Sequence, residues 1–305
     1  MNSGNAQKNN SPQDRWISER LRPIETVMRP VFAAPPRACD SHMHIFGPAE
    51  TYPGAPDARY TLPEGSLEQY CAVSDLLGLE RAVFVQPSYY GTDNSCLLDA
   101  MKGFGRPCRG VVFLPERIAP KEIEAFHRQG VRGIRLDFFK ADQDKWDQSA
   151  IVAKLRHASD IARDVGWHVE LYSPGYVTRS LFDCLGGLDV DFCVNHLGYM
   201  KADHGIADAD FVHFSELART KHCWVKLTGP YRVAPDDQRT RTDWMAKTLV
   251  AAAPERVIWG TDWPHLPHGS RDTGELFNRL AEWCPDETVR HNILVRNPAR
   301  LYQFD

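Results

Sequence analysis

The sequence has 305 residues, of which 43% are hydrophobic and 25% are charged, and its formal net charge is −4. This composition is ordinary for a globular protein and provides no basic surface for nucleic acid, and no stretch approaches the roughly 18 apolar residues of a membrane span. The eight cysteines lie far apart without a CxxC pair, and there is no apolar signal segment, so we expect a cytoplasmic protein.

Residues 1–37 are polar and then rich in proline, without helical or strand periodicity. We expect this N-terminal extension to be partly disordered and partly an arm over the domain or a neighbouring subunit. From residue 38 to residue 305, short apolar runs alternate with longer amphipathic segments. This rhythm is typical of βα units and a parallel sheet.

The alternating segments predict an α/β fold with one domain. The predicted strands are 38–44, 81–86, 109–113, 133–137, 168–171, 191–195, 224–227 and 257–260. The predicted helices are 66–77, 94–104, 120–129, 149–164, 177–185, 209–220, 241–252, 273–283 and 286–294. Eight strands with helices between them predict a single (β/α)8 TIM-type barrel. A doubly wound sheet is the alternative, but the GxGxxG turn expected after its first strand is absent.

The first predicted strand carries two histidines, and the last is followed by an aspartate; both residue types are common in catalytic sites. His42 and His44 share one face of their strand because strand side chains alternate, and the last strand ends in Asp262 before Pro264. Since catalytic groups of parallel barrels gather where the strands end, we expect these side chains to meet. Other polar residues at predicted strand ends are Ser88, Arg135, Asp137, Glu170, Tyr172, His196, Lys226 and Arg232.

These residue types fit ester hydrolysis. An ionised aspartate such as Asp262 can accept a proton from water. Imidazole N–H groups or a metal ion can stabilise the resulting oxyanion, at about 3 kcal/mol per donor. Arginine side chains such as Arg135 and Arg232 suit a carboxylate or sulfonate, unless Arg135 is instead held in an ion pair with Asp137 or Glu170.

Several motifs resemble the amidohydrolase superfamily, in its 2-pyrone-4,6-dicarboxylate lactonase-like branch. They are HMH at 42–44, NHLG at 195–198 and GTDWPH at 260–265, and the likeness runs from about residue 40 to residue 302. The branch also includes sulfomuconolactone hydrolase and sugar lactonases. The resemblance implies a lactonase that opens a carboxylated lactone, such as a pyrone dicarboxylate or a muconolactone, in aromatic-compound breakdown.

The resemblance also implies roles for residues. Asp262 would be the general base, and His42, His44 and His196 would polarise the lactone carbonyl. The residues implied to hold the substrate are Tyr60, Ser88, Arg135, Tyr172 and Arg232. Two arginines of the branch have no counterpart, since Ala141, next to Lys140, and Tyr199 stand in their places. Apart from the resemblance, the loop histidines His204, His265 and His268 could line the mouth of the site, but we expect them to be surface residues.

Metal dependence can be argued either way from these residues. His42, His44, His196 and Asp262 could together bind one Zn²⁺. A two-metal site would need further ligands where the chain has Arg135 and Tyr172, and an arginine is a poor neighbour for a dication. We therefore expect metal-free catalysis, as in the lactonase that the chain resembles.

Three other functions stay open. The first is a metal-dependent sulfolactone or sugar-lactone hydrolase, or a lactone isomerase. The second is a metal-dependent decarboxylase of an aromatic acid, and the third is a binding protein that has lost turnover. The expected partner is a small anionic lactone, and the sequence leaves a homodimer open.

Overall fold

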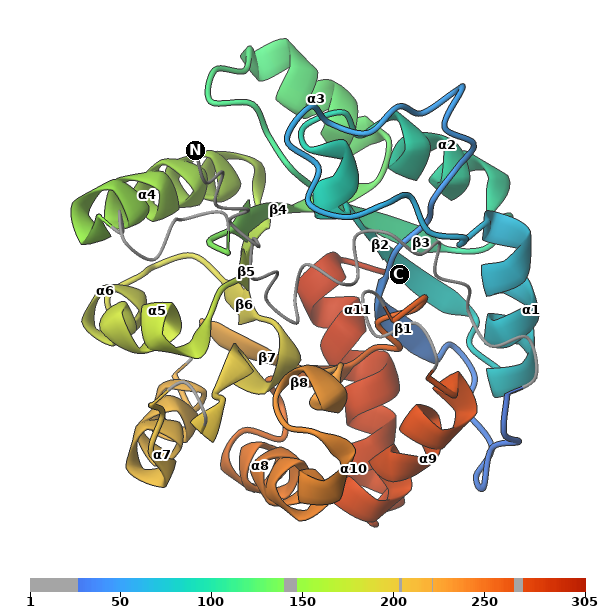
Figure 1. The fold of residues 1–305 in the computed structure, drawn as a ribbon, viewed down its shortest axis with the longest axis vertical. Helices are drawn as coiled ribbons and strands as arrows, with labels where there is room; N and C mark the ends of the chain where they lie inside the picture. Colours follow the sequence, from blue (N-terminus) through green and yellow to red (C-terminus); the bar gives the residue numbers. More distant parts are fainter. Residues whose placement is uncertain (1–26, 140–146, 203–204, 221, 266–270) are drawn as a thin grey trace, which may run out of the picture.

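The strands form one parallel sheet that curls into a barrel (Figure 1). The computed structural model describes residues 27–139, 147–202, 205–220, 222–265 and 271–305. The strands are β1 (Cys39–Met43), β2 (Arg81–Val85), β3 (Cys108–Val112), β4 (Val131–Asp137), β5 (His168–Tyr172), β6 (Phe192–Val194), β7 (Cys223–Leu227) and β8 (Val257–Trp259). Each strand pairs in parallel with its neighbours in sequence, so the predicted (β/α)8 barrel is confirmed.

Helices surround the strands in Figure 1. They are α1 (Leu67–Leu77), α2 (Ser95–Gly103), α3 (Pro120–Arg128), α4 (Gln148–Val165), α5 (Gly175–Ser180), α6 (Phe182–Gly186), α7 (Asp208–Leu217), α8 (Arg239–Ala252), α9 (Thr273–Trp283), α10 (Glu287–His291) and α11 (Asn297–Tyr302). Their ends follow local chemistry. In α1, for example, the Ser66 side chain accepts from the Gln69 N–H, and Gly78 ends the helix with a positive φ of 70°.

Two predicted helices differ from the structure. The predicted helix 177–185 is two short helices, α5 and α6, which meet at Leu181. The helix predicted at 286–294 begins as α10, continues through a π-helical segment, Asn292–Arg296, and runs into α11, which was not predicted. Local turn geometry decides these breaks, and apolar periodicity does not report it.

The barrel closes between β1 and the segment after β8. Met43 forms a parallel bridge with Trp263. The Asp262 N–H donates to the His42 carbonyl at 2.8 Å, and the His44 N–H donates to the Trp263 carbonyl at 2.8 Å. The predicted histidine pair and the predicted aspartate therefore lie side by side because they form the seam of the barrel.

A buried carboxylate strengthens this seam. Asp40 Oδ1 accepts from the backbone N–H groups of His42 at 3.0 Å and Thr261 at 2.9 Å. Asp40 Oδ2 accepts from the hydroxyls of Thr261 at 2.6 Å and Tyr70 at 3.0 Å. Burial raises the pKa of Asp40 to about 6, although these four donors oppose the shift.

The C-terminal segment covers the amino-terminal end of the barrel. Arg81 and Arg109, at the starts of β2 and β3, donate to the carbonyls of Asp305 and of Tyr302, at 2.8 and 3.1 Å. Tyr302 is fully buried, and in Figure 1 the C-terminus lies near the middle of the barrel. The carboxyl end of the barrel is left for a functional site, as in other barrels of this type.

The described part of the N-terminal extension lies along α9. The Met28 N–H donates to the Asp272 carboxylate at 2.9 Å, and Phe32 stacks on Phe277 with ring centroids 4.5 Å apart. Residues 1–26, for which we predict partial disorder, lie outside the described residues, as do Lys140 and Ala141. No helix in the described part of the chain is long and apolar enough to cross a membrane.

Candidate active site

The seam of the barrel brings His42, His44 and Asp262 to one point at its carboxyl end. Asp262 Oδ1 lies 3.7 Å from His42 Nε2 and 3.8 Å from His44 Nε2. All three residues are buried. Within the described residues, neither Asp262 Oδ1 nor His42 Nε2 has a hydrogen-bond partner. Buried polar atoms normally form hydrogen bonds, so these two atoms without partners indicate a place where a ligand or water binds.

His44 presents a lone pair to this point. Its Nδ1 lies 2.7 Å from the carbonyl oxygen of Val85, which can only accept, so the ring proton of His44 is on Nδ1. Burial, reinforced by the charge of Arg135, holds the pKa of His44 well below its ordinary value. The neutral ring therefore accepts at Nε2 and does not donate there, which differs from the carbonyl-polarising role that the resemblance implies.

A buried ion pair contacts His42 at Nδ1, the ring nitrogen that faces away from Asp262. Lys226 Nζ lies 3.0 Å from His42 Nδ1 and 2.5 Å from Glu170 Oε2, and Asn195 donates to Glu170 Oε1 at 3.0 Å. Burial alone would raise the pKa of Glu170, but the charge of Lys226, together with His168 and Arg135, outweighs burial, so the pKa is lowered. Burial and then Lys226 hold the pKa of His42 well below its ordinary value, so this ring is neutral too.

The second oxygen of Asp262 is fully engaged. Oδ2 accepts from Arg232 Nε at 2.5 Å and from the Tyr231 hydroxyl at 2.6 Å. The Tyr231 oxygen also lies 3.1 Å from His265 Nδ1, and His265 Nε2 lies 2.9 Å from the hydroxyl of Thr273. These contacts fix the carboxylate so that Oδ1 alone faces the histidines.

His265 is fully buried, so the expectation of a surface histidine is wrong at this position. The sequence around His265 does not reveal its contact with Tyr231, because the two residues lie in different loops. His204 and His268, for which we had the same expectation, lie outside the described residues.

His196 completes the cluster from the end of β6. Its ring centroid lies 5.1 Å from that of His42, and its Nδ1 lies 2.9 Å from the hydroxyl of Thr228. Burial and then Arg232 hold its pKa well below the ordinary value. His196 and Asp262 have φ values of 51° and 60°, a region that side chains other than glycine rarely adopt. Such backbone strain is typical of functional sites.

Arg135 enters the site from β4. Its guanidinium carbon lies 4.7 Å from the centroid of the Tyr172 ring, and its Nη1 donates to the Gln86 carbonyl at 2.6 Å. Its Nε is buried without a hydrogen-bond partner among the described residues. Arg135 therefore retains a donor with which to bind an anion.

The ion pairs considered as the alternative for Arg135 do not occur in the described part of the chain. Asp137 binds Arg59 instead, at 2.6 Å, and Glu170 binds Lys226. Arg135 is thus a buried arginine without a described carboxylate within 4.0 Å. A buried unpaired charge is costly, which favours an anionic ligand beside it.

The other predicted substrate residues line the same end of the barrel. The Tyr60 hydroxyl accepts from the Tyr89 N–H at 3.2 Å and is hydrogen-bonded to Ser88. Burial raises the pKa of Tyr60 to about 12, and the charge of Arg135 opposes that rise. Tyr60 and Ser88 therefore lie beside Arg135, while Arg232, also predicted to hold the substrate, binds Asp262.

An aromatic wall, formed by Phe139, Tyr172 and Tyr199, borders this centre. The Phe139 ring centroid lies 4.5 Å from that of Tyr172 and 4.7 Å from that of Tyr199. Tyr172 and Tyr199 lie 5.9 and 5.7 Å from His196. The wall gives an aromatic border against which an unsaturated ring can pack.

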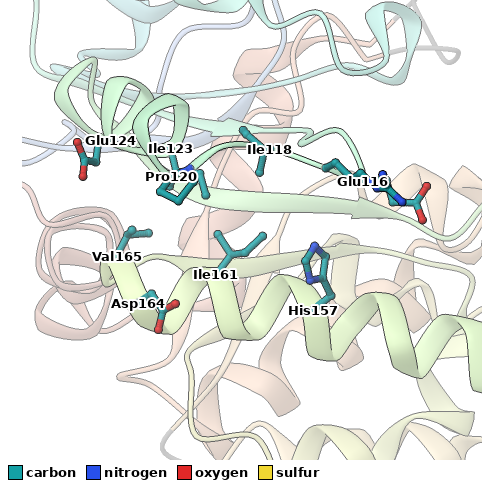
Figure 2. A pocket seen from close by; sticks show the side chains of 10 residues that line it. Glu116, Ile118, Pro120, Ile123, Glu124, His157, Ile161, Asp164 and Val165 are labelled. Atoms are coloured by element: carbon teal, nitrogen blue, oxygen red, sulfur yellow. The ribbon is translucent and has the colours of Figure 1, made fainter.

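Two hollows lie beside α4. One, of about 450 Å³, opens on the outside of the barrel between α3 and α4, and Figure 2 shows His157 and Ile161 on its floor. It contains none of the predicted site residues. The other, of about 570 Å³, shares His157 and Ile161 with it and also includes Arg135 and Asp137. Of the predicted site residues, only Arg135 lines this second hollow.

The central residues also fit a single metal ion. His42, His44 and Asp262 each offer one ligand atom, all within 4.8 Å of one another. The unpaired Asp262 Oδ1 and the lone pair of His44 are suitable donors for Zn²⁺. His42 could serve as a ligand through Nε2 when its ring proton is on Nδ1, the atom that lies 3.0 Å from Lys226 Nζ.

Sequence reasoning missed the supporting residues of this site. Lys226 and Glu170 were recognised as strand-end residues, and strand alternation places them inside the barrel, but it does not reveal that they bind His42. Tyr231 was not singled out, and His265, although part of the motif at 260–265, was not expected to be buried beside Tyr231. Their roles depend on contacts across loops that only the folded chain brings together.

Comparison with known proteins places the chain among barrel hydrolases. Residues 39–304 match the protein family described as amidohydrolase. The chain is 34% identical to 4-sulfomuconolactone hydrolase of Rhizobium radiobacter, over 89% of this chain and 91% of the relative. It is 33% identical to 2-pyrone-4,6-dicarboxylate hydrolase of Comamonas testosteroni, over 90% and 92%. A solved structure from Pseudomonas putida, given the name 2-pyrone-4,6-dicarboxylic acid hydrolase, has a TM-score of 0.77 and 28% identity over 89% of this chain and 99% of the other.

Proposed function

The chain belongs to the amidohydrolase family, and we propose that it is a lactonase that opens an anionic lactone in the breakdown of aromatic compounds. Relatives at 33 and 34% identity bear the names of such hydrolases. The observation that carries the proposal is the setting of Asp262. One oxygen is fixed by Arg232 and Tyr231, and the other is buried, unpaired and directed at two histidines.

Asp262 Oδ1 is the general base in this proposal. It takes a proton from a water molecule, whose oxygen attacks the lactone carbonyl carbon. His44 Nε2 accepts the second O–H of the same water, since both acceptors lie 3.8 Å apart. The ring C–O bond then breaks, the acyl carbon keeps the hydroxyl, and the proton passes to the leaving oxygen.

His42 stabilises the oxyanion. Its Nε2 carries a proton because Lys226 occupies Nδ1, and it is a donor without an acceptor among the described residues. The cationic donor behind the ring makes this N–H a stronger donor. A preorganised donor of this kind contributes about 3 kcal/mol to the stability of the transition state.

The substrate is an unsaturated lactone with a carboxylate or sulfonate. Arg135, buried and without a described carboxylate partner, binds the anionic group, and the aromatic wall packs on the ring. Relatives named for a sulfonated and for a dicarboxylated substrate are almost equally similar to the chain. Both anions offer oxygens to an arginine, so a single site can accept either.

We propose that turnover does not require a metal, because His42 and Asp262 already supply the donor and the base. Where a divalent ion is bound, His42, His44 and Asp262 would hold it, and it would polarise the carbonyl and acidify a water. Activity that survives exhaustive chelation supports the metal-free mechanism. Loss of activity on chelation and its return with Zn²⁺ would replace it with a metal-dependent one.

A substrate panel tests the function. Carboxylated pyrones, carboxylated and sulfonated muconolactones and neutral sugar lactones are compared by acid release, and aromatic acids by CO₂ release. We expect turnover of the anionic lactones only. CO₂ release from an aromatic acid would instead indicate a decarboxylase, and binding without turnover would indicate a non-catalytic protein.

We also propose that the protein is cytoplasmic. The eight cysteines form no disulfide, which fits a reducing compartment.

Asp262→Asn tests the base. The amide keeps the shape of the carboxylate but cannot take a proton, so kcat should fall by roughly 10²–10⁴-fold. The melting temperature and the circular dichroism spectrum show whether the fold is kept. A folded variant that retains more than about a tenth of the wild-type kcat would remove Asp262 as the base.

A further inference from the structure

Lys226 is an unusual residue for the inside of a barrel. It lies on β7, its side chain is fully buried, and its Nζ reaches two groups, Glu170 Oε2 and His42 Nδ1. It does not face the point where Asp262 and the histidines converge, because His42 lies in between. Lysine is almost never fully buried without a partner, and here the charge is balanced by Glu170.

The hydrogen bond between Lys226 and His42 can have only one direction. An ammonium group has three donors and no acceptor, so Lys226 donates and His42 Nδ1 accepts. A neutral imidazole carries one proton, so it must then be on Nε2. His44, two residues away, has the opposite tautomer, because its Nδ1 donates to the Val85 carbonyl and its Nε2 is unprotonated. The two rings therefore present a donor and an acceptor to the same point.

We propose that Lys226 is a positioning residue that keeps the ring proton of His42 on Nε2, so that His42 faces the substrate as a donor instead of a metal ligand. The placement of the proton is a property of the folded chain. Its value for catalysis rests on the proposed lactonase function.

The structure also contains the alternative arrangement. Glu170 Oε1 lies 3.5 Å from His42 Nδ1 and could accept a proton from it if Lys226 did not occupy that nitrogen. A histidine whose far nitrogen donates to a carboxylate is typical of metal sites, since the near nitrogen is then free to ligate. Lys226 thus separates a metal-free site from a metal site by one hydrogen bond.

The position of the proton can be measured directly. The full chain, labelled with ¹⁵N-histidine and freed of metal with a chelator, is examined by NMR through the ring nitrogens, with His42 assigned from its loss in His42→Gln. In the wild type we expect a protonated Nε2 and a bare Nδ1 on His42. In Lys226→Met we expect the proton on Nδ1. His44 should keep its proton on Nδ1 in both proteins, which makes it an internal control.

Lys226→Met leaves Glu170 buried without its counter-charge, so this variant could fail to fold. The double variant Lys226→Met with Glu170→Gln removes both charges and keeps an amide oxygen facing His42. We expect the same move of the proton to Nδ1. A wild-type His42 protonated on Nδ1, or a proton that stays on Nε2 in the folded variants, would overturn the proposal.

Zinc binding gives a second readout that needs no substrate. Zn²⁺ alone is titrated by calorimetry into metal-free wild type and both variants, and we expect the variants to bind it about 10–100-fold more tightly. Equal affinities would contradict the proposal. A wild type with the proton on Nε2 that hydrolyses no lactone would support the placement of the proton and reject the proposed function, so the two failures are distinguishable.

Discussion

The two oxygens of Asp262 lie in different surroundings. Oδ2 accepts from Arg232 and Tyr231, and Oδ1 has no partner among the described residues. Burial opposes the charge of Arg232, but Asp262 and the surrounding tyrosines together outweigh burial and hold the pKa of Arg232 well above its usual range. The geometry therefore leaves Oδ1 as the atom available to act as the proposed base. We therefore expect Arg232 to orient the proposed base as well as to line the proposed substrate site.

Tyr231→Phe should lower kcat by about tenfold with little change in KM. The hydroxyl is buried and donates to Asp262 Oδ2, so its loss should free the carboxylate to turn. The residues that contact the substrate are unchanged, so KM should change little. Tyr52→Phe, which removes a hydroxyl bonded to the exposed Asp99, serves as the control and should leave kcat unchanged. Equal kinetics for both variants would show that Arg232 alone orients the base.

Arg135→Met should lower kcat/KM by one to two orders of magnitude on an anionic lactone, because a buried charge-assisted hydrogen bond contributes about 1.5–3 kcal/mol. The same change should barely alter turnover of the neutral methyl ester. The two substrates are compared with one enzyme preparation, so any loss of folded protein cancels. Equal losses on acid and ester would show that Arg135 is structural and would favour a neutral lactone.

The convergence of the proposed catalytic residues was predictable, because these residues lie where strands end. His42, His44 and Asp262 follow from strand alternation and from the rule that barrel sites form where strands end. The hydrogen-bond pattern around them was not predictable. The same residues at the same positions are compatible with either ring proton on His42, and the choice depends on Lys226 Nζ, 184 residues away in the chain.

At the scale of elements, two short turns shape the site. The 3₁₀ segments His196–Tyr199 and Pro230–Arg232 follow β6 and β7, and they place His196, Tyr231 and Arg232 within reach of Asp262. Between β7 and its turn, Gly229 adopts a φ of 53°. A side chain there would meet Asp262 Oδ2 and His196 Nδ1, each at 2.9 Å, so only glycine lets the backbone pass this close.

Gly229→Ala should therefore damage activity more than stability. The added methyl would displace Asp262 or His196, and we expect kcat/KM to fall at least tenfold. Gly105→Ala is a matched control, because Gly105 also has a positive φ, of 69°, and a Cβ added there would meet no atom within 4 Å. Both should lose about 1–2 kcal/mol of stability in denaturant unfolding. An equal loss of activity in both variants would contradict a specific contact at Gly229.

The elements themselves were largely predictable, and their breaks were not. All eight strands were found because buried parallel strands are short, apolar and separated by amphipathic helices. The break at Leu181 and the π-helical segment Asn292–Arg296 were missed. In both places the apolar periodicity continues across the change, so the pattern carries no mark of the altered backbone.

At the scale of the whole molecule, the site and the closure of the barrel are one feature. The bridge from Met43 to Trp263 and the bonds between the His42 and Asp262 backbones close the sheet, and the same residues carry the proposed chemistry. A change that loosens the seam should therefore reduce activity before it unfolds the barrel. Asp40 is the residue that ties the seam without facing Asp262, which makes it the place to test this link.

Asp40→Asn should remove a pH dependence of stability. Burial raises the pKa of Asp40 in the folded chain to about 6, from an ordinary value of 3.8, so the folded state binds the extra proton between these values. The contribution of Asp40 to stability is therefore greatest below pH 4 and is lost as the pH rises through about 6, by up to about 3 kcal/mol. The asparagine variant does not titrate. Its amide oxygen can accept from the His42 and Thr261 N–H groups, and its amide nitrogen can donate to rotated hydroxyls.

The measurement is the free energy of unfolding in urea, for wild type and Asp40→Asn, between pH 4 and pH 7. We expect the wild type to lose stability relative to the variant as the pH rises, because only the wild type must keep a charge inside the seam. Asp40→Ala, which loses the bonds to Thr261 altogether, should be less stable than Asp40→Asn at every pH. A difference between wild type and Asp40→Asn that stays constant across this range would mean that the four donors hold the ionised carboxylate as well as water does, and that the seam is stabilised by charge.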